Sequence, residues 1–285
     1  MDVVSPSDPA DPYLRAYDAV LARWPVPVDV LELASGYGTT RVNACGPPGA
    51  PPLVLLAGGF ATSTVWFRNV AGLAAAHRVY AVDVICDRGR SIPSGRPTAG
   101  VAELMDWFDT VLDGLGLDET VLCGHSYGGW IALRYALHAP RRVRQLVLLD
   151  PTQCFAGFSP RFLLHSLPVL LRPNARRTLE HLSWETDGAL LDPDWLALQA
   201  AGAATARPKL VTGRPPAAEE LKTLTMPVLL ILAGRSKAHS VTRVEQRAQA
   251  TVPDLTVRTL PNSTHFTIPA LHASDLNREL LAQLR

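Results

Sequence analysis

The sequence has few cysteines and no long apolar run. Its four cysteines, Cys45, Cys86, Cys123 and Cys154, are widely spaced and form no CxxC pair, which argues against a zinc site and against a dense disulfide framework. No apolar segment reaches the roughly 18 residues of a membrane-spanning helix, and the first residues lack the basic and apolar regions of a signal peptide. We therefore expect a soluble cytoplasmic protein with reduced cysteines and with neither a metal nor an organic cofactor.

A strong charge of either sign is also absent. Lys and Arg number 27 and Asp and Glu number 26, so the formal net charge is +1. Nucleic acid or an anionic membrane surface would require a basic stripe, and we expect neither as a partner; no feature of the sequence indicates an oligomeric state. A chain of 285 residues that is 47% hydrophobic can form one α/β domain with a modest insertion.

Apolar runs alternate with amphipathic segments along most of the chain. Residues 10–23 predict an N-terminal helix, and the runs VDVLELAS and TTRVNACG, joined by Gly36-Tyr37-Gly38, predict an antiparallel edge pair. We then expect strands at 53–57, 78–84, 119–123, 145–149, 228–233 and 255–260, and helices at 64–75, 99–115, 127–138, 240–250 and 268–284. This alternation predicts right-handed βαβ crossovers in one mostly parallel central sheet flanked by helices.

The alternation stops between residues 152 and 226. Three segments there have helical patterns, with breaks at Pro173 and Pro193: SPRFLLHSLPVLLRP, ARRTLEHLSWETDG and DPDWLALQAAGAATA. We therefore predict a core domain of residues 1–151 and 227–285, and a helical cap of residues 152–226 that is inserted after the strand ending at Asp150.

The segment Gly124-His125-Ser126-Tyr127-Gly128 lies between a predicted strand and a predicted helix. This context is the one in which a GxSxG motif forms a nucleophile elbow. The serine occupies a strained turn, so the residues two before and two after it must be small for the strand and the helix to approach each other. Gly124 and Gly128 meet that demand, which predicts Ser126 as a nucleophile with His125 packed beneath the turn.

A serine nucleophile needs a base and an oxyanion hole. His265, in the segment PNSTHF after the last predicted strand, has the chain position expected of the base. The oxyanion is met by the N–H group of the residue after the nucleophile and by one from the loop after the first parallel strand. We expect these donors to be the backbone N–H groups of Tyr127 and Phe60.

These motifs, in this order, resemble the α/β-hydrolase superfamily from about Ala16 to the C-terminus. The match to its bacterial serine carboxylesterases is specific in the segments RWPVPVDVLELASGYGTTRVNACGPPGAPPLVLL, VYAVDVICDRGRSIPSG and GHSYGGWIALRYALHAPRRVRQLVLLDP. The resemblance implies an α/β-hydrolase fold, a Ser-His-acid triad, and cleavage of carboxylic esters without a cofactor.

The sequence departs from the superfamily pattern in two places. Gly58-Gly59 stands where a His-Gly pair is common, so the oxyanion loop lacks a bracing imidazole. The loop after strand 228–233 contains no carboxylate, and Lys237 stands near the usual position of the triad acid, where it would repel an imidazolium. Some members supply the acid from the end of the preceding strand, which is Asp150 here; its alternative role is that of a turn residue before Pro151.

The predicted function is a serine hydrolase that cleaves a carboxylic ester, or a related acyl bond, through an acyl-Ser126 intermediate with His265 as base and Asp150 as acid. Its partner is a small-molecule ester or acyl substrate. The alternatives are a non-hydrolytic, lactone or thioester role in a biosynthetic pathway, and a ligand-binding module with degraded catalysis. Ligand sites of this fold lie at the carboxyl ends of the strands, and four residues are candidates for substrate contact: Gly59, Trp66, Phe155 and Phe158.

Overall fold

The structure is a computed structural model that describes residues 11–205 and 208–284. Its strands are β1 (Asp29–Ser35), β2 (Gly38–Cys45), β3 (Pro52–Leu56), β4 (Arg78–Val82), β5 (Ile92–Pro93), β6 (Thr120–His125), β7 (Val143–Leu149), β8 (Val228–Ala233) and β9 (Leu255–Leu260). In the described part of the chain they form one sheet with the order β1-β2-β4-β3-β6-β7-β8-β9, and β5 pairs with β2.

The sheet is parallel from β4 to β9, and the antiparallel pair β1 and β2 extends it at one edge. The predicted antiparallel edge pair and the mostly parallel sheet are therefore confirmed. The short strand β5 has no counterpart in the prediction, because two residues leave no periodic pattern.

The core helices are α1 (Pro12–Leu21), α2 (Val70–Ala74), α3 (Val101–Gly114), α4 (Tyr127–His138), α9 (Val241–Thr251), α10 (Thr267–Ala270) and α11 (Ala273–Gln283), with 3₁₀ turns η1 (Ser63–Arg68) and η2 (Pro140–Arg142). Two predicted helices are each divided in the structure. Residues 64–75 form η1 and α2, and residues 268–284 form α10 and α11. Residue 10, the first of the predicted N-terminal helix, lies outside the described residues.

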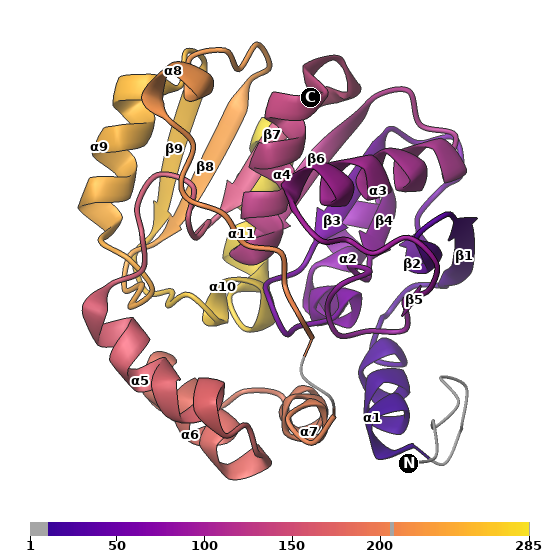
Figure 1. Ribbon diagram of the computed structural model, residues 1–285, viewed down its shortest axis with the longest axis vertical. Coiled ribbons are helices and arrows are strands. Elements are labelled where there is room, and N and C mark those ends of the chain that lie inside the picture. Colours follow the sequence, from indigo (N-terminus) through magenta and orange to yellow (C-terminus); the bar gives the residue numbers. More distant parts are fainter. Residues whose placement is uncertain (1–10, 206–207, 285) are drawn as a thin grey trace.

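Buried apolar side chains cover both faces of the sheet, as the uninterrupted apolar strands predict. Consecutive residues of one strand point to opposite faces and enter different clusters. Val54 packs with α3, α4 and α9 on one face, and Leu55 packs with α2, α10 and α11 on the other. Figure 1 shows the sheet between these two helical layers. Such a sheet places the carboxyl ends of β3, β6, β7 and β8 side by side, which is where the candidate site lies.

Between β7 and β8 the described chain forms the helices α5 (Pro160–Leu171), α6 (Ala175–Glu185), α7 (Pro193–Gly202) and α8 (Ala218–Leu221). Helices α5, α6 and α7 lie together beyond the sheet (Figure 1). Helix α1 packs against α7, and Arg23 Nη1 lies 2.8 Å from Asp194 Oδ2. Residue 206, the last of the third segment with a helical pattern, lies outside the described residues. None of the helices described here is both long and apolar enough to pass through a membrane.

Candidate active site

Ser126 sits in a strained turn between β6 and α4. Its φ of 54° and ψ of −114° fall outside the regions that serine ordinarily adopts. The turn leaves no room for a side chain on either side of Ser126. A Cβ atom on Gly124 would lie 2.2 Å from the Gly128 carbonyl oxygen, and one on Gly128 would lie 2.4 Å from the Leu56 carbonyl oxygen. Both glycines are therefore required by the close approach of the strand and the helix.

The structure brings Ser126, His265 and Asp150 together. Ser126 Oγ lies 2.8 Å from His265 Nε2, and His265 Nδ1 lies 2.6 Å from Asp150 Oδ2. A carboxylate only accepts hydrogen bonds, so Nδ1 carries the proton and Nε2 is left to accept the serine hydroxyl. His265 follows β9 and Asp150 follows β7, so three strand ends contribute one chain of hydrogen bonds.

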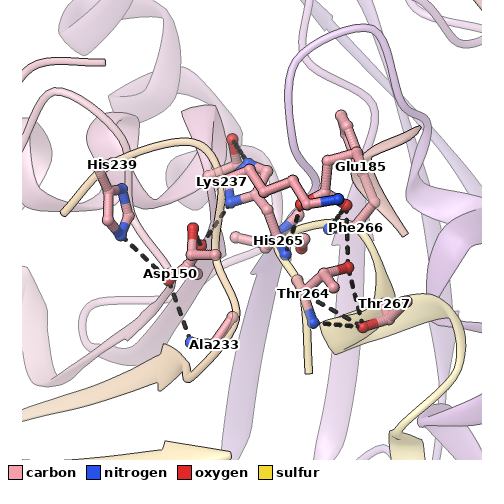
Figure 2. Close-up of polar contacts among 12 residues, drawn as sticks. Asp150, Glu185, Ala233, Lys237, His239, Thr264, His265, Phe266 and Thr267 are labelled. Atoms are coloured by element: carbon pink, nitrogen blue, oxygen red, sulfur yellow. Dashed lines mark hydrogen bonds and ion pairs between the residues drawn. The ribbon is translucent and has the colours of Figure 1, made fainter. Parts of the chain in front are cut away.

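The carboxylate of Asp150 is fully buried and receives four donors. Besides His265, these are the Ala233 N–H at 3.1 Å, the Ser236 hydroxyl at 2.7 Å and His239 Nε2 at 3.1 Å. Burial by itself raises the pKa of Asp150, but His239 and His265 together hold that pKa well below its usual range. Asp150 is therefore an anion at neutral pH, and Figure 2 shows it between His239, Ala233 and the His265 loop.

Lys237 does not face His265. Its ammonium group donates to the Trp184 carbonyl oxygen and pairs with Asp187 Oδ1 at 2.6 Å. It also lies 4.8 Å from the centre of the Trp184 ring. The lysine near the usual acid position is thus neutralised by the loop that follows α6, and the repulsion expected from its place in the sequence is absent.

His125, the residue before the nucleophile, packs beneath the turn as predicted. It is 3% exposed, and its Nε2–H donates to the His265 carbonyl oxygen at 2.8 Å. Desolvation, together with the nearby His265, lowers the pKa of His125 to about 3. It therefore stays neutral and ties the end of β6 to the loop that carries His265.

The backbone N–H of Phe60 is directed at a carboxylate rather than left for an oxyanion. It donates to Asp87 Oδ2 at 2.9 Å and to Oδ1 at 3.1 Å, and Phe60 has a φ of 62°. The prediction that the Phe60 N–H is an oxyanion donor is therefore wrong in this structure. Asp87 also braces the loop that lacks the usual imidazole, and burial raises its pKa to about 7.

The remaining candidate donors lie next to Ser126. Tyr127 is the first residue of α4, where backbone N–H groups have no partner within the helix. A Cβ atom on Gly58 would lie 3.3 Å from Ser126 Cβ, and one on Gly59 would lie 3.4 Å from Tyr127 Cβ. Gly58 therefore lies beside Ser126 and Gly59 beside Tyr127, and the N–H of the peptide between the two glycines belongs to Gly59.

A cavity of about 770 Å³ lies above Ser126 and His265. Its lining is mostly apolar and comes from the sheet ends, from α5 and α6, and from residues 208–213. Of the predicted substrate contacts, Gly59 and Phe158 line it, and so does Phe60. Phe162, Leu163, Val169 and Leu170 of α5 also line it; sequence reasoning missed them because the helical pattern of α5 does not say which face meets the cavity.

Trp66 and Phe155 do not line this cavity, which corrects two of the predicted substrate contacts. Trp66 is 0% exposed in the cluster beneath α2 and α11, and Phe155 is 1% exposed in the cluster beneath α4. Both positions follow from packing, because a large aromatic side chain gains more from full burial than from a place at a cavity wall. Within the described residues, no group of three His, Cys, Asp or Glu side chains is arranged to hold a metal ion.

Residues 53–279 match the alpha/beta hydrolase family, and the chain belongs to that family. Among curated proteins, it is 30% identical to the carboxylesterase YbfK of Bacillus subtilis over 89% of this chain and 87% of that protein. It is 31% identical to the uncharacterized carboxylesterase nap of the same organism, over 91% and 88% of the two chains.

Solved structures agree with these relationships. The crystal structure of carboxylesterase CesB (YbfK) from Bacillus subtilis superposes with a TM-score of 0.88 at 28% identity, covering 95% of this chain and 96% of that one. The naproxen esterase (carboxylesterase NP) from Bacillus subtilis has a TM-score of 0.89 at 28% identity, covering 97% and 98%. The predictions of an α/β-hydrolase fold and of a hydrolase of the carboxylesterase type are confirmed.

Proposed function

We propose that Ser126, His265 and Asp150 form the catalytic triad of a serine hydrolase that cleaves carboxylic esters through an acyl-Ser126 intermediate. One observation carries the proposal: the chain of hydrogen bonds from Ser126 Oγ through both His265 nitrogens to Asp150, with distances of 2.8 Å and 2.6 Å. This is the arrangement that activates a serine hydroxyl, because each group is oriented by the next.

In the acylation step, Ser126 Oγ attacks the ester carbonyl carbon and its proton passes to His265 Nε2. The imidazolium that forms is stabilised by the anionic carboxylate of Asp150, which stays unprotonated because of its low pKa. His265 then protonates the departing alkoxide. In deacylation the same nitrogen takes a proton from water while the hydroxide attacks the acyl carbon. The bond from that carbon to Ser126 Oγ then breaks, His265 returns the proton to Oγ, and the acid is released.

The oxyanion of each tetrahedral intermediate needs backbone donors. We assign this role to the N–H groups of Tyr127 and Gly59. The dipole of α4 adds to the effect, since Tyr127 is at the N-terminus of that helix. Asp87 has a supporting role, because its hydrogen bonds to the Phe60 N–H fix the loop that presents Gly59.

The lining of the cavity supports a small-molecule ester with an apolar acyl or aryl group as substrate. Phe158 and Phe162 stack with their ring centroids 5.6 Å apart, and both contribute to the cavity wall. Because α5 and α6 supply much of that wall, we propose that the predicted cap of residues 152–226 covers the core through α5, α6 and α7. The two ends of this segment pack into the core instead, with Phe155 beneath α4 and α8 against α9, and residues 1–10 of the predicted core of residues 1–151 and 227–285 lie outside the described residues. The cap would select substrates by shape.

The absence of an acid after β8 suggests two alternatives: a non-hydrolytic, lactone or thioester role, and a ligand-binding module with degraded catalysis. The contact between Asp150 and His265 counts against degraded catalysis, because the triad needs no acid from that loop, and the similarity to carboxylesterases favours ester hydrolysis over a non-hydrolytic role.

The test is the release of p-nitrophenol from a short-chain p-nitrophenyl ester by the wild-type protein and by Ser126→Ala, with a fluorophosphonate as a covalent probe. We expect turnover and stoichiometric labelling in the wild type and neither in the variant. Equal turnover by the two proteins would refute the assignment of Ser126.

A further inference from the structure

Glu185, the last residue of α6, makes three hydrogen bonds to the loop that carries His265. Its Oε1 accepts the His265 N–H at 2.9 Å. Its Oε2 accepts the Phe266 N–H at 3.0 Å and the Thr264 hydroxyl at 2.9 Å. Three consecutive residues of the loop are therefore held by one side chain from the helical segment between β7 and β8 (Figure 2).

This carboxylate is buried without an ion-pair partner among the described residues. Burial raises the pKa of Glu185, while the nearby His265 and the three hydrogen bonds act in the opposite direction. Burying a carboxylate costs free energy that well-packed apolar residues of similar volume would not cost. Packing alone therefore does not account for a buried carboxylate at position 185, whereas its hydrogen bonds to the loop that carries His265 do.

Every polar group of His265 has a partner. Nε2 meets Ser126 and Nδ1 meets Asp150, while His125 donates to the carbonyl oxygen and Glu185 accepts the N–H. The first three partners lie at strand ends of the core sheet, and Glu185 belongs to α6. The ring of Phe162 on α5 also meets the His265 ring edge-on, with the centroids 6.3 Å apart, but among the described residues it is Glu185 that holds the backbone of His265 by hydrogen bonds from these helices.

We propose that Glu185 is a positioning residue for His265. Through its hydrogen bonds, Glu185 couples the alignment of the triad to the position of α6 over the cavity. The inference rests on the proposed function, since it gives His265 the role of base. A displaced α6 would release the N–H groups of His265 and Phe266, and Nε2 would lose its alignment with Ser126. Full activity would then require the helical segment to be closed on the core.

The charge of Glu185 provides a signature that a purely structural residue would lack. An anion close to His265 favours the imidazolium over the neutral imidazole. Neutralising Glu185 therefore removes a charge that stabilises the imidazolium, and we expect the acid limb of kcat/KM to move to lower pH. The titratable groups around His265 in the described chain are Asp150, Glu185, His125, His181 and His239; all except Glu185 are unchanged in this test.

The experiment compares Glu185→Gln with wild type and with Glu180→Gln, which alters an exposed carboxylate of the same helix that pairs with Arg176. The constants kcat and KM are measured with a p-nitrophenyl ester from pH 5 to 9. The concentration of active sites, which kcat requires, is determined by titration with a fluorophosphonate. We expect Glu185→Gln to lower kcat by roughly ten- to a hundredfold, since misplacement of a catalytic group by about 1 Å costs about 10². We expect KM to change less than threefold and the acid limb to move down by roughly half a unit.

Glu180→Gln should match the wild type in all three quantities. The proposal is overturned if Glu185→Gln keeps wild-type kcat, or if kcat falls while the acid limb stays in place. Should Glu185→Gln not fold, Glu185→Asp decides, because it keeps the charge and withdraws the carboxylate by one methylene: a lower kcat with an unmoved acid limb supports the proposal, and wild-type kcat refutes it. Failure of the proposed function is a separate result, seen as activity that survives Ser126→Ala.

Discussion

Replacement of Asp150 by asparagine tests the acid of the triad while keeping its shape. The carboxylate receives His265 Nδ1 and the Ser236 hydroxyl on one oxygen, and the Ala233 N–H and His239 Nε2 on the other. An amide has one accepting oxygen and one donating nitrogen. At one of the two positions, therefore, the amide N–H groups would point at the donors that now bind a carboxylate oxygen. If the amide nitrogen faces His265, the ring must adopt the opposite tautomer and Nε2 can no longer accept the serine proton.

The expected loss can be estimated from the chemistry. A wrong-tautomer histidine costs about 10⁴ in kcat, which is about 5.4 kcal/mol of transition-state stabilisation. Because the pKa of Asp150 is held well below its usual range, ionised Asp150 also stabilises the fold above pH 4 or so, and that contribution is lost as the pH falls further. Asp150→Asn should therefore unfold at a lower denaturant concentration at neutral pH.

The assay is ester turnover corrected with Ser126→Ala, combined with urea unfolding followed by circular dichroism. Asp187→Asn is the matched control, since Asp187 pairs with Arg235 and Lys237 at the surface rather than with His265. The control should keep its rate within about threefold, because surface ion pairs contribute little. A rate within tenfold of wild type for folded Asp150→Asn would remove Asp150 from the triad.

Three further outcomes follow from the described contacts. Lys237→Met should keep kcat within about threefold, because the ammonium faces Asp187 and not the triad; a large change in kcat would contradict this. Gly128→Ala should yield no active folded protein, since its Cβ would lie 2.4 Å from the Leu56 carbonyl oxygen; normal thermal unfolding with full activity would count against the tight elbow. Asp87 has a pKa raised to about 7, so the folded state binds more protons than the unfolded state between roughly pH 4 and 7 and loses stability as pH rises; in Asp87→Asn, urea unfolding at pH 5 and 7.5 should show a smaller difference than in the wild type.

The parts of the site that the sequence predicted are those that rest on local pattern. Ser126 is fixed by its own strand, turn and helix, and His265 by its place after the last strand. Asp150 could be named only with the help of the resemblance, because some members of the superfamily supply the acid from the end of this strand. The arguments for Ser126 and His265 need only a short stretch of sequence and the rule that parallel strands end at one edge of the sheet.

The parts that the sequence did not predict depend on contacts between distant segments. Asp87 reaches Phe60 across 27 positions, and Glu185 reaches His265 across 80. Neither stands in a recognisable motif, so only the folded chain reveals what each one binds. Trp66 and Phe155 were misplaced for a related reason: an aromatic residue near a strand end can enter the core or the cavity, and the direction of its side chain is set by neighbours from other elements.

The loop after β8 explains how the chain manages without an acid in its usual position. That loop contains no carboxylate, yet it and the last residue of β8 supply three donors to Asp150: the Ala233 N–H, the Ser236 hydroxyl and His239 Nε2. Strand β7 lies beside β8 in parallel, so a carboxylate at the end of β7 meets those donors without any change in the sheet. The anion at position 150 and the donors after β8 depend on each other, since the carboxylate would be costly to bury without them. An acid placed at position 237 would therefore add a second negative charge beside Asp187 in place of the ammonium that now pairs with it, and we expect it to weaken the site rather than to supply a better triad acid.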